Sequence, residues 1–155
     1  MRRFVTLLSI FCLSVLILHA GEKAASGRVI KVLPHLVDLA GKHSVSPSLY
    51  DRDAYQAHLR QHPEQVSGIR YDIQWKAKNT DGEKLKLRIE LRSDVKDKPP
   101  GEMALEKEVE DGWRSKWTSL PLTGDAYKKF GTVTAWRATL WKGDQLLGEQ
   151  KSFLW

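Results

Sequence analysis

Apolar and polar side chains alternate along much of the chain, and this alternation predicts β-strands. Every second residue from Ile69 to Ala77 is apolar, and polar or charged residues stand between them. The same alternation runs from Leu85 to Leu91. Because successive side chains of a strand point to opposite faces, each segment is expected to bury one face. The Asn-Thr-Asp-Gly turn at 79–82 predicts that the two strands form a hairpin facing one core.

Less regular patterns predict the remaining strands, which lie at 28–39, 103–110, 113–120, 132–141 and 145–155. Pro34 has no N–H to donate, so the first of these strands is expected at a sheet edge or bent in two. The many charges of 103–110 favour an edge position for that strand as well. Turn residues separate all of these segments, as in a chain that folds back on itself repeatedly.

Helical signals are confined to two places. A helix is predicted over 49–61, because Ser48 is a good N-cap and Pro63 is a stop signal. A short helical turn is predicted at 125–130. Seven strands with mostly short connections and no regular alternation with helices predict a mostly-β fold. We expect an antiparallel two-sheet sandwich with one short helix between its first and second strands.

Three segments are typical of a known class of sandwich: the Trp-bearing strand 69–77, the helical corner 123–127 ahead of strand 135–140, and the closing strand 151–155. With these features, residues 28–155 resemble the immunoglobulin-like and fibronectin type III-like domains of exported bacterial proteins. The Cys pair of antibody domains is absent. The resemblance implies a single β-sandwich domain that serves as a binding or scaffold module more often than as a catalyst.

The first twenty residues have a pattern of their own. Arg2 and Arg3 precede an apolar run from Phe4 to Leu18, and a small residue, Ala20, follows. This is the layout of a secretory signal peptide. A membrane-spanning helix needs about 20 apolar residues, so cleavage after Ala20 is favoured over the alternative of a permanent anchor. We therefore expect a signal peptide at 1–20, a flexible lead at 21–27 and a periplasmic or extracellular domain after it.

Composition narrows the chemistry of that domain. The chain has 155 residues, with 25 Lys and Arg, 19 Asp and Glu, and one cysteine. Because Cys12 lies in the predicted signal peptide, the domain can form no disulfide and has no thiolate for catalysis or metal binding. Basic and acidic residues are interleaved, which argues against a nucleic acid partner. After removal of the signal peptide no apolar run is long enough to span a membrane.

The histidines supply the strongest enzyme-like signal. The sequence lacks the phosphate-loop, nucleophile-elbow, His-Glu-x-x-His and calcium-loop signatures, so we expect no cofactor. However, His35, His43, His58 and His62 lie close in the sequence, and the last two are spaced i, i+4 on the predicted helix. That spacing puts two imidazoles on one helix face, as a metal site needs. The alternative function is therefore a small metal-assisted hydrolase; the simpler interpretation is that His62 complements the helix dipole and His58 lies on the surface.

The chain also holds six tryptophans. Exposed tryptophans can form a platform for sugar rings, whereas buried ones fill the space between sheets about 10 Å apart. By parity Trp113 and Trp117 share a strand face, and Trp136 and Trp141 point to opposite faces. We expect Trp136 in the core and Trp141 outside or at the rim. The candidate ligand-binding residues are Trp141, Trp113 and Trp117.

Together these observations favour an exported, non-catalytic binding or structural module. The expected partner is a protein or a carbohydrate of the cell envelope. The sequence leaves the identity of the ligand and the oligomeric state open.

Overall fold

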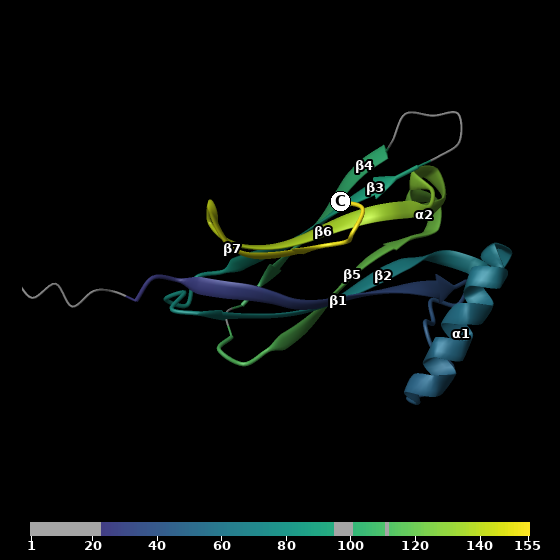
Figure 1. Ribbon diagram of the computed structural model, residues 1–155, viewed down its shortest axis with the longest axis horizontal. Coiled ribbons are helices and arrows are strands. Elements are labelled where there is room, and N and C mark those ends of the chain that lie inside the picture. The colour runs from purple at the N-terminus through teal and green to yellow at the C-terminus, as the bar shows by residue number, and fades with distance from the viewer. Residues whose placement is uncertain (1–22, 95–100, 111) are drawn as a thin grey trace, which may run out of the picture.

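The computed structural model describes residues 23–94, 101–110 and 112–155, and the protein is an antiparallel β-sandwich (Figure 1). One sheet has the strand order β1–β2–β5, and the other has the order β4–β3–β6–β7. The strands are β1 Ser26–Asp38, β2 Val66–Lys78, β3 Leu85–Ser93, β4 Gly101–Val109, β5 Lys116–Thr123, β6 Val133–Lys142 and β7 Gln145–Lys151. The predicted fold class is confirmed. The predicted signal peptide at 1–20 lies outside the described residues.

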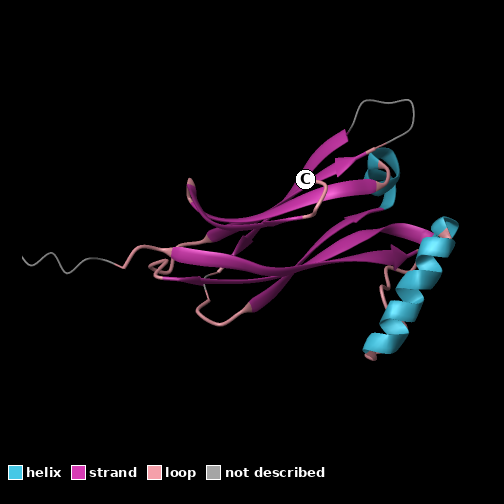
Figure 2. Cartoon of the chain, viewed as in Figure 1, coloured by secondary structure: helices cyan, strands magenta, loops and turns pink. Residues whose placement is uncertain are grey.

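Both helices lie at one end of the sandwich, beyond the layers formed by the strands (Figure 2). The helix α1 (Leu49–Gln61) connects β1 to β2 with the predicted bounds, and α2 (Gly124–Phe130) connects β5 to β6. Ser48 caps α1 because its hydroxyl accepts a hydrogen bond from the backbone N–H of Asp51 at 3.4 Å. Leu59 of α1 is fully buried and anchors the helix to the sandwich.

The outermost strands carry the residues that suit an edge. β1 is an edge strand of the three-stranded sheet and contains Pro34, as predicted. It begins at Ser26, so the last two residues of the predicted lead belong to the strand. The register with β2 shifts between Val29 and Lys31, which marks a bulge. The charged strand β4 is likewise an edge strand, as expected.

The predicted hairpin of the second and third strands is wrong. β2 pairs with β1 and β5, whereas β3 pairs with β4 and β6 in the other sheet. The connecting turn has positive φ at Asn79, Asp81 and Gly82, and it carries the chain from one sheet to the other. Alternation determines which face of a strand is buried but not which strand lies beside it. The two strands therefore do face one core, from opposite sheets.

The core lies between the two sheets and is built from their inward-facing side chains. Its completely or almost completely buried members include Tyr71, Ile73, Trp75, Leu85, Leu87, Ile89, Leu91, Ala138 and Leu140. The indole N–H of Trp75 donates a hydrogen bond to Thr118 Oγ1 at 2.9 Å, so its polar atom is satisfied inside the core. Trp136 is partly buried and packs against the same cluster, on the face expected for it.

One flank of the sandwich is closed by a tight approach of β1 and β7. Gly27 and Gly148 lie at the contact, and a Cβ on Gly148 would stand only 2.9 Å from Arg28 Cα and 3.0 Å from the Gly27 carbonyl oxygen. Glycine is required here because the two backbones leave no room for a side chain. The edges of the two sheets are thereby brought together on this side.

The last predicted strand is shorter than expected. β7 ends at Lys151, so the prediction that the strand continues to residue 155 is wrong. Ser152 still bonds to β6, because its N–H donates to the Trp136 carbonyl oxygen at 2.9 Å and its hydroxyl accepts from the Trp136 N–H at 3.0 Å, and a turn follows. As a result Phe153 is fully exposed.

Among the described residues no helix is both long enough and apolar enough to cross a membrane.

Candidate functional site

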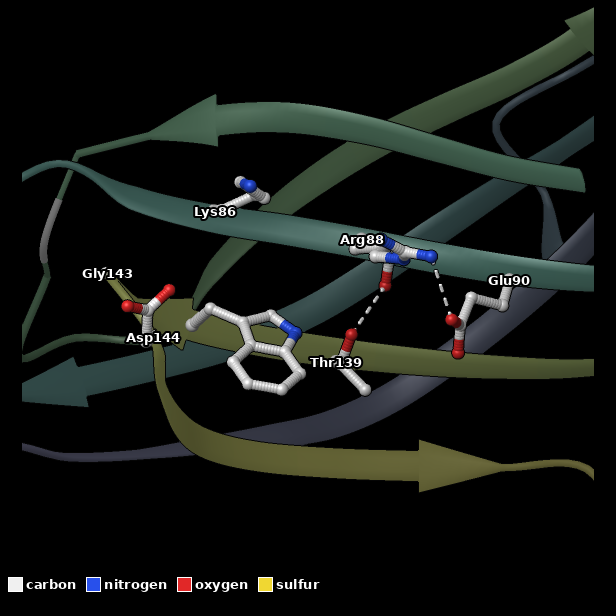
Figure 3. Close-up of a pocket in the computed structure, with 7 residues that line it drawn as sticks. Lys86, Arg88, Glu90, Thr139, Gly143 and Asp144 are labelled. Atoms are coloured by element: carbon white, nitrogen blue, oxygen red, sulfur yellow. Dashed lines mark hydrogen bonds and ion pairs between the residues drawn. The ribbon is translucent and has the colours of Figure 1, made fainter.

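The outer face of the four-stranded sheet contains a depression of about 290 Å³ (Figure 3). It is lined by Lys86, Arg88 and Glu90 of β3, Thr139 and Trp141 of β6, and Gly143 and Asp144 of the turn that follows β6. The candidate Trp141 is thus part of a concave site, and it is half-buried there.

Strand register explains why these side chains meet. Lys86 pairs with Trp141, Arg88 pairs with Thr139, and all four side chains point away from the core because the residues between them point into it. This places Trp141 on the face opposite to Trp136, as predicted. The turn after β6 brings Asp144 to the end of the depression.

Ion pairs hold the charged side chains of this face in place. Arg88 binds Glu106 at 3.0 Å and Glu90 at 2.9 Å, and Arg137 binds Glu90 at 2.6 Å. Pairs this exposed contribute little to stability, about 0–1 kcal/mol each. Their effect is to fix the positions of donors and acceptors around the indole of Trp141.

Two polar atoms at the depression have no hydrogen-bond partner among the described residues. These are the indole Nε1 of Trp141 and the Nε of Arg88, and both are buried. The nearby Thr139 hydroxyl donates to the Arg88 carbonyl oxygen at 3.5 Å (Figure 3). A buried donor without a partner costs about 1–3 kcal/mol. Both N–H groups are covered by neighbouring atoms, so a ligand in the depression would bind instead to the accessible polar groups of Lys86, Arg88, Glu90 and Asp144 that line it.

A second depression, of about 350 Å³, continues along the same face. Trp155 lies there, and the guanidinium carbons of Arg92 and Arg137 are 4.1 and 5.1 Å from the centroid of its ring. These distances are within the range of cation–π attraction. Trp155 was not predicted to line a surface depression, because the alternation placed it in a continuous closing strand, whereas β7 ends at Lys151.

The other two candidate tryptophans lie elsewhere. Trp117 belongs to β5 and is 52% exposed on the outer face of the three-stranded sheet. Trp113 precedes β5, so the prediction that it shares a strand face with Trp117 is wrong. It is 69% exposed, and the guanidinium of Arg114 lies 4.6 Å from the centroid of its ring. Trp113, Trp117 and Trp141 therefore do not form one aromatic platform.

The four histidines do not form one cluster either. His35 and His43 lie together with Asp72, and one ligand atom from each of these three residues lies within 4.8 Å of the others. His58 and His62 of the α1 region are not part of that group, and their rings contact each other with centroids 4.3 Å apart. The predicted pairing of His58 with His62 on one helix face is seen, but a joint site of all four histidines is not.

Asp72 is the centre of the first group. Its Oδ2 accepts hydrogen bonds from Arg70 at 2.8 Å and contacts His35 Nδ1 at 3.0 Å, and its Oδ1 accepts one from Ser119 at 2.5 Å. Burial by itself would raise the pKa of Asp72, but the hydrogen bonds from Arg70 and Ser119 outweigh it and lower the pKa. Burial and the neighbouring Arg70 lower the pKa of His43. Sequence spacing gave no sign of this group, because Asp72 comes from β2.

Comparisons with known proteins support the fold alone. No protein-family model matches the chain, and no curated protein matches it. A crystal structure from Akkermansia muciniphila is similar over 83% of this chain and 70% of that chain, with 12% sequence identity and a TM-score of 0.51. The similarity is compatible with the two-sheet β-sandwich described above.

Proposed function

We propose that this chain is an exported, non-catalytic binding module whose ligand site is the depression around Trp141. The observation that carries the proposal is the half-buried indole of Trp141 in a concave site that is also lined by the charged side chains of β3 and by Asp144. Sites for small ligands combine an apolar surface with a few polar groups that fix orientation. This depression has both.

The chemistry of the lining favours a carbohydrate of the cell envelope. An indole face offers an apolar surface to a sugar ring, and sugar hydroxyls both donate and accept hydrogen bonds. Lys86 and Arg88 supply donors, whereas Glu90 and Asp144 supply acceptors, so both needs are met within one site. The mixed charge argues against nucleic acid, which requires a basic surface. A protein partner on the same face is the alternative.

Strand order supports the immunoglobulin-like or fibronectin type III-like assignment. In seven-stranded domains of the immunoglobulin class the first, second and fifth strands pair in one sheet, and the third, sixth and seventh pair in the other. Both groups occur here, with β4 beside β3 rather than in the first sheet. By analogy with such domains, this architecture serves as a binding or scaffold module more often than as a catalyst, which agrees with a binding role.

Export is supported by the basic start, the apolar run and the small residue at 20. The module would then act in the periplasm or outside the cell. The alternative of a hydrolase that uses all four histidines is weakened, because His58 and His62 lie outside the group formed by His35 and His43.

A glycan array and a pull-down from cell-envelope extract test the proposal together. We expect the wild-type protein to retain a defined glycan, Trp141→Ala and Asp144→Ala to lose it, and Trp113→Ala to bind like the wild type. Asp144 is exposed, so its replacement should leave folding intact. Loss of binding in this variant would then reflect the site itself, even if the Trp141 variant unfolds. Loss of binding on Trp113→Ala with retention on Asp144→Ala would contradict the site. Retention of a protein but no glycan would select the alternative partner.

A further inference from the structure

We propose that His35, His43 and Asp72 form a binding site for a divalent transition metal on the outer face of the three-stranded sheet. The site is separate from the Trp141 depression, which lies on the other sheet. It offers two imidazole nitrogens and one carboxylate oxygen, the donor set of a zinc-type site with three protein ligands. Imidazole donors favour zinc, cobalt, nickel or copper over magnesium or calcium.

The donors are already close enough to converge. The three ligand atoms lie within 4.8 Å of one another, and the His35 and His43 ring centroids are 5.3 Å apart. Ligand atoms stand about 2.0–2.2 Å from a zinc ion. Two neighbouring donors of a bound zinc ion are therefore closer to each other than the 4.8 Å limit within which these three atoms lie. Rotation of the His43 side chain, which lies in the loop after β1, can supply the remaining movement.

The surrounding structure orients each donor. His35 lies on β1 with only 7% of its surface exposed, and its strand register is fixed opposite Arg70 of β2. Ser119 of β5 holds the far oxygen of Asp72 at 2.5 Å. Gln56 of α1 donates to the His43 carbonyl oxygen at 2.9 Å and so ties that loop to the helix. Metal sites in proteins depend on supporting hydrogen bonds of this kind.

Arg70 already places a positive charge among these donors. Its Nη2 contacts His43 Nε2 at 3.2 Å and Asp72 Oδ2 at 2.8 Å, so one guanidinium N–H group bridges two of the three prospective ligands. The Nε of Arg70 is buried and has no hydrogen-bond partner among the described residues, so this position leaves the guanidinium incompletely satisfied. A bound metal ion would displace the Arg70 guanidinium from these donors. The Arg70 side chain would then turn to solvent. Arg70 therefore competes with the metal for the site.

The His58–His62 pair has a weaker case. His58 Nε2 contacts Gln65 Oε1 at 3.1 Å, and His62 Nδ1 contacts Glu64 Oε1 at 3.1 Å, so each imidazole has a partner at the surface. This pair supplies two imidazoles from an exposed helix, without the buried carboxylate of the first group. It would nevertheless take up metal from solution, because its spacing suits chelation. It therefore has to be removed before the proposed site is measured.

The test is titration of Co²⁺, followed by visible absorption, and of Zn²⁺, followed by calorimetry. All samples are untagged and carry His58→Gln and His62→Gln. We expect one saturable equivalent of metal, binding at least about tenfold weaker after His43→Ala, and tighter binding after Arg70→Met. Asp53→Ala, which removes an exposed carboxylate of α1, is the matched control and should change nothing.

Circular dichroism melts show which variants fold, and His43→Ala should fold because its side chain lies in a loop. The proposal is overturned if His43→Ala binds metal as tightly as its parent. It is also overturned if neither the parent nor Arg70→Met binds one equivalent, because removal of the competing guanidinium should reveal any site that exists.

Discussion

Trp136 and Trp141 are five residues apart on β6 and meet different surroundings. Trp136 packs against the core cluster, whereas Trp141 lines a depression on the outer face. Their separation by an odd number of residues was enough to predict opposite faces, because side chains alternate along a regular strand. The concave shape around Trp141 was not predictable, since it also depends on Asp144 in the following turn and on side chains of β3.

Asp38, at the end of β1, gives the molecule a pH-sensitive contact with α1. Its carboxylate accepts hydrogen bonds from Tyr55 Oη at 2.6 Å and from the backbone N–H groups of Lys42 and Ala40 at 2.8 and 2.9 Å. The hydrogen bond from Tyr55 lowers the pKa of Asp38 most, against a smaller opposing effect of burial. The pKa is thus lower in the folded protein than in the unfolded chain, where it is about 3.9.

A group with a depressed folded pKa stabilises the protein above its unfolded pKa, and that stabilisation is lost as the pH falls through the folded value. We therefore expect Tyr55→Phe to lower the free energy of unfolding near neutral pH and to reduce the loss that occurs in acid. Denaturant melts of wild type and variant from pH 7 down to about pH 2 measure both effects. Parallel curves across that range would show that Tyr55 does not act through Asp38.

At the scale of elements, the buried side chain of Gln56 connects α1 to the backbone of β1. Gln56 Oε1 accepts from the Leu36 N–H at 2.8 Å, and Gln56 Nε2 donates to the carbonyl oxygens of Leu36 and His43 at 2.8 and 2.9 Å. The amide therefore satisfies backbone groups of an edge strand that β2 does not reach. No periodicity in the sequence marks Gln56 for this role, because it looks like any polar residue of a surface helix.

We expect Gln56→Ala to destabilise the protein by about 1–3 kcal/mol, since it leaves backbone polar groups near the helix without partners. Denaturant melts give the free energy of unfolding, and amide exchange at Leu36 should accelerate. Gln61→Ala is the control, because Gln61 lies at the exposed end of the same helix. Equal effects of the two substitutions would mean that the contacts of Gln56 add nothing specific.

The sequence predicted the elements better than their neighbours. Helix α1 has the predicted bounds because a cap and a proline mark its ends locally. The hairpin failed because β2 and β3 have equally good buried faces, and strand pairing is decided by the packing of two whole sheets. The same limit applies to Asp72, which joins His35 and His43 only through the β1–β2 register. Contacts set by local rules were predictable, and contacts set by topology were not.

At the scale of the molecule, the flank where β1 meets β7 depends on two glycines. We expect Gly148→Ala to destabilise the sandwich by about 1–3 kcal/mol, because the new methyl group would meet the backbone at Arg28 rather than a movable side chain. Glu149→Ala, at the exposed neighbouring position, should have little effect. Thermal melts of both variants decide the matter. A Gly148→Ala protein as stable as wild type would show that the flank can open without cost.

The long first strand separates the two ends of the molecule. β1 begins at Ser26, at the end opposite the helices, and its thirteen residues run to the α1 end (Figure 1). At about 3.3 Å per residue such a strand extends roughly 40 Å. Ser26 and the helical end of the sandwich therefore lie about that far apart. A surface that held the chain at Ser26 would therefore leave the helical end facing away from it.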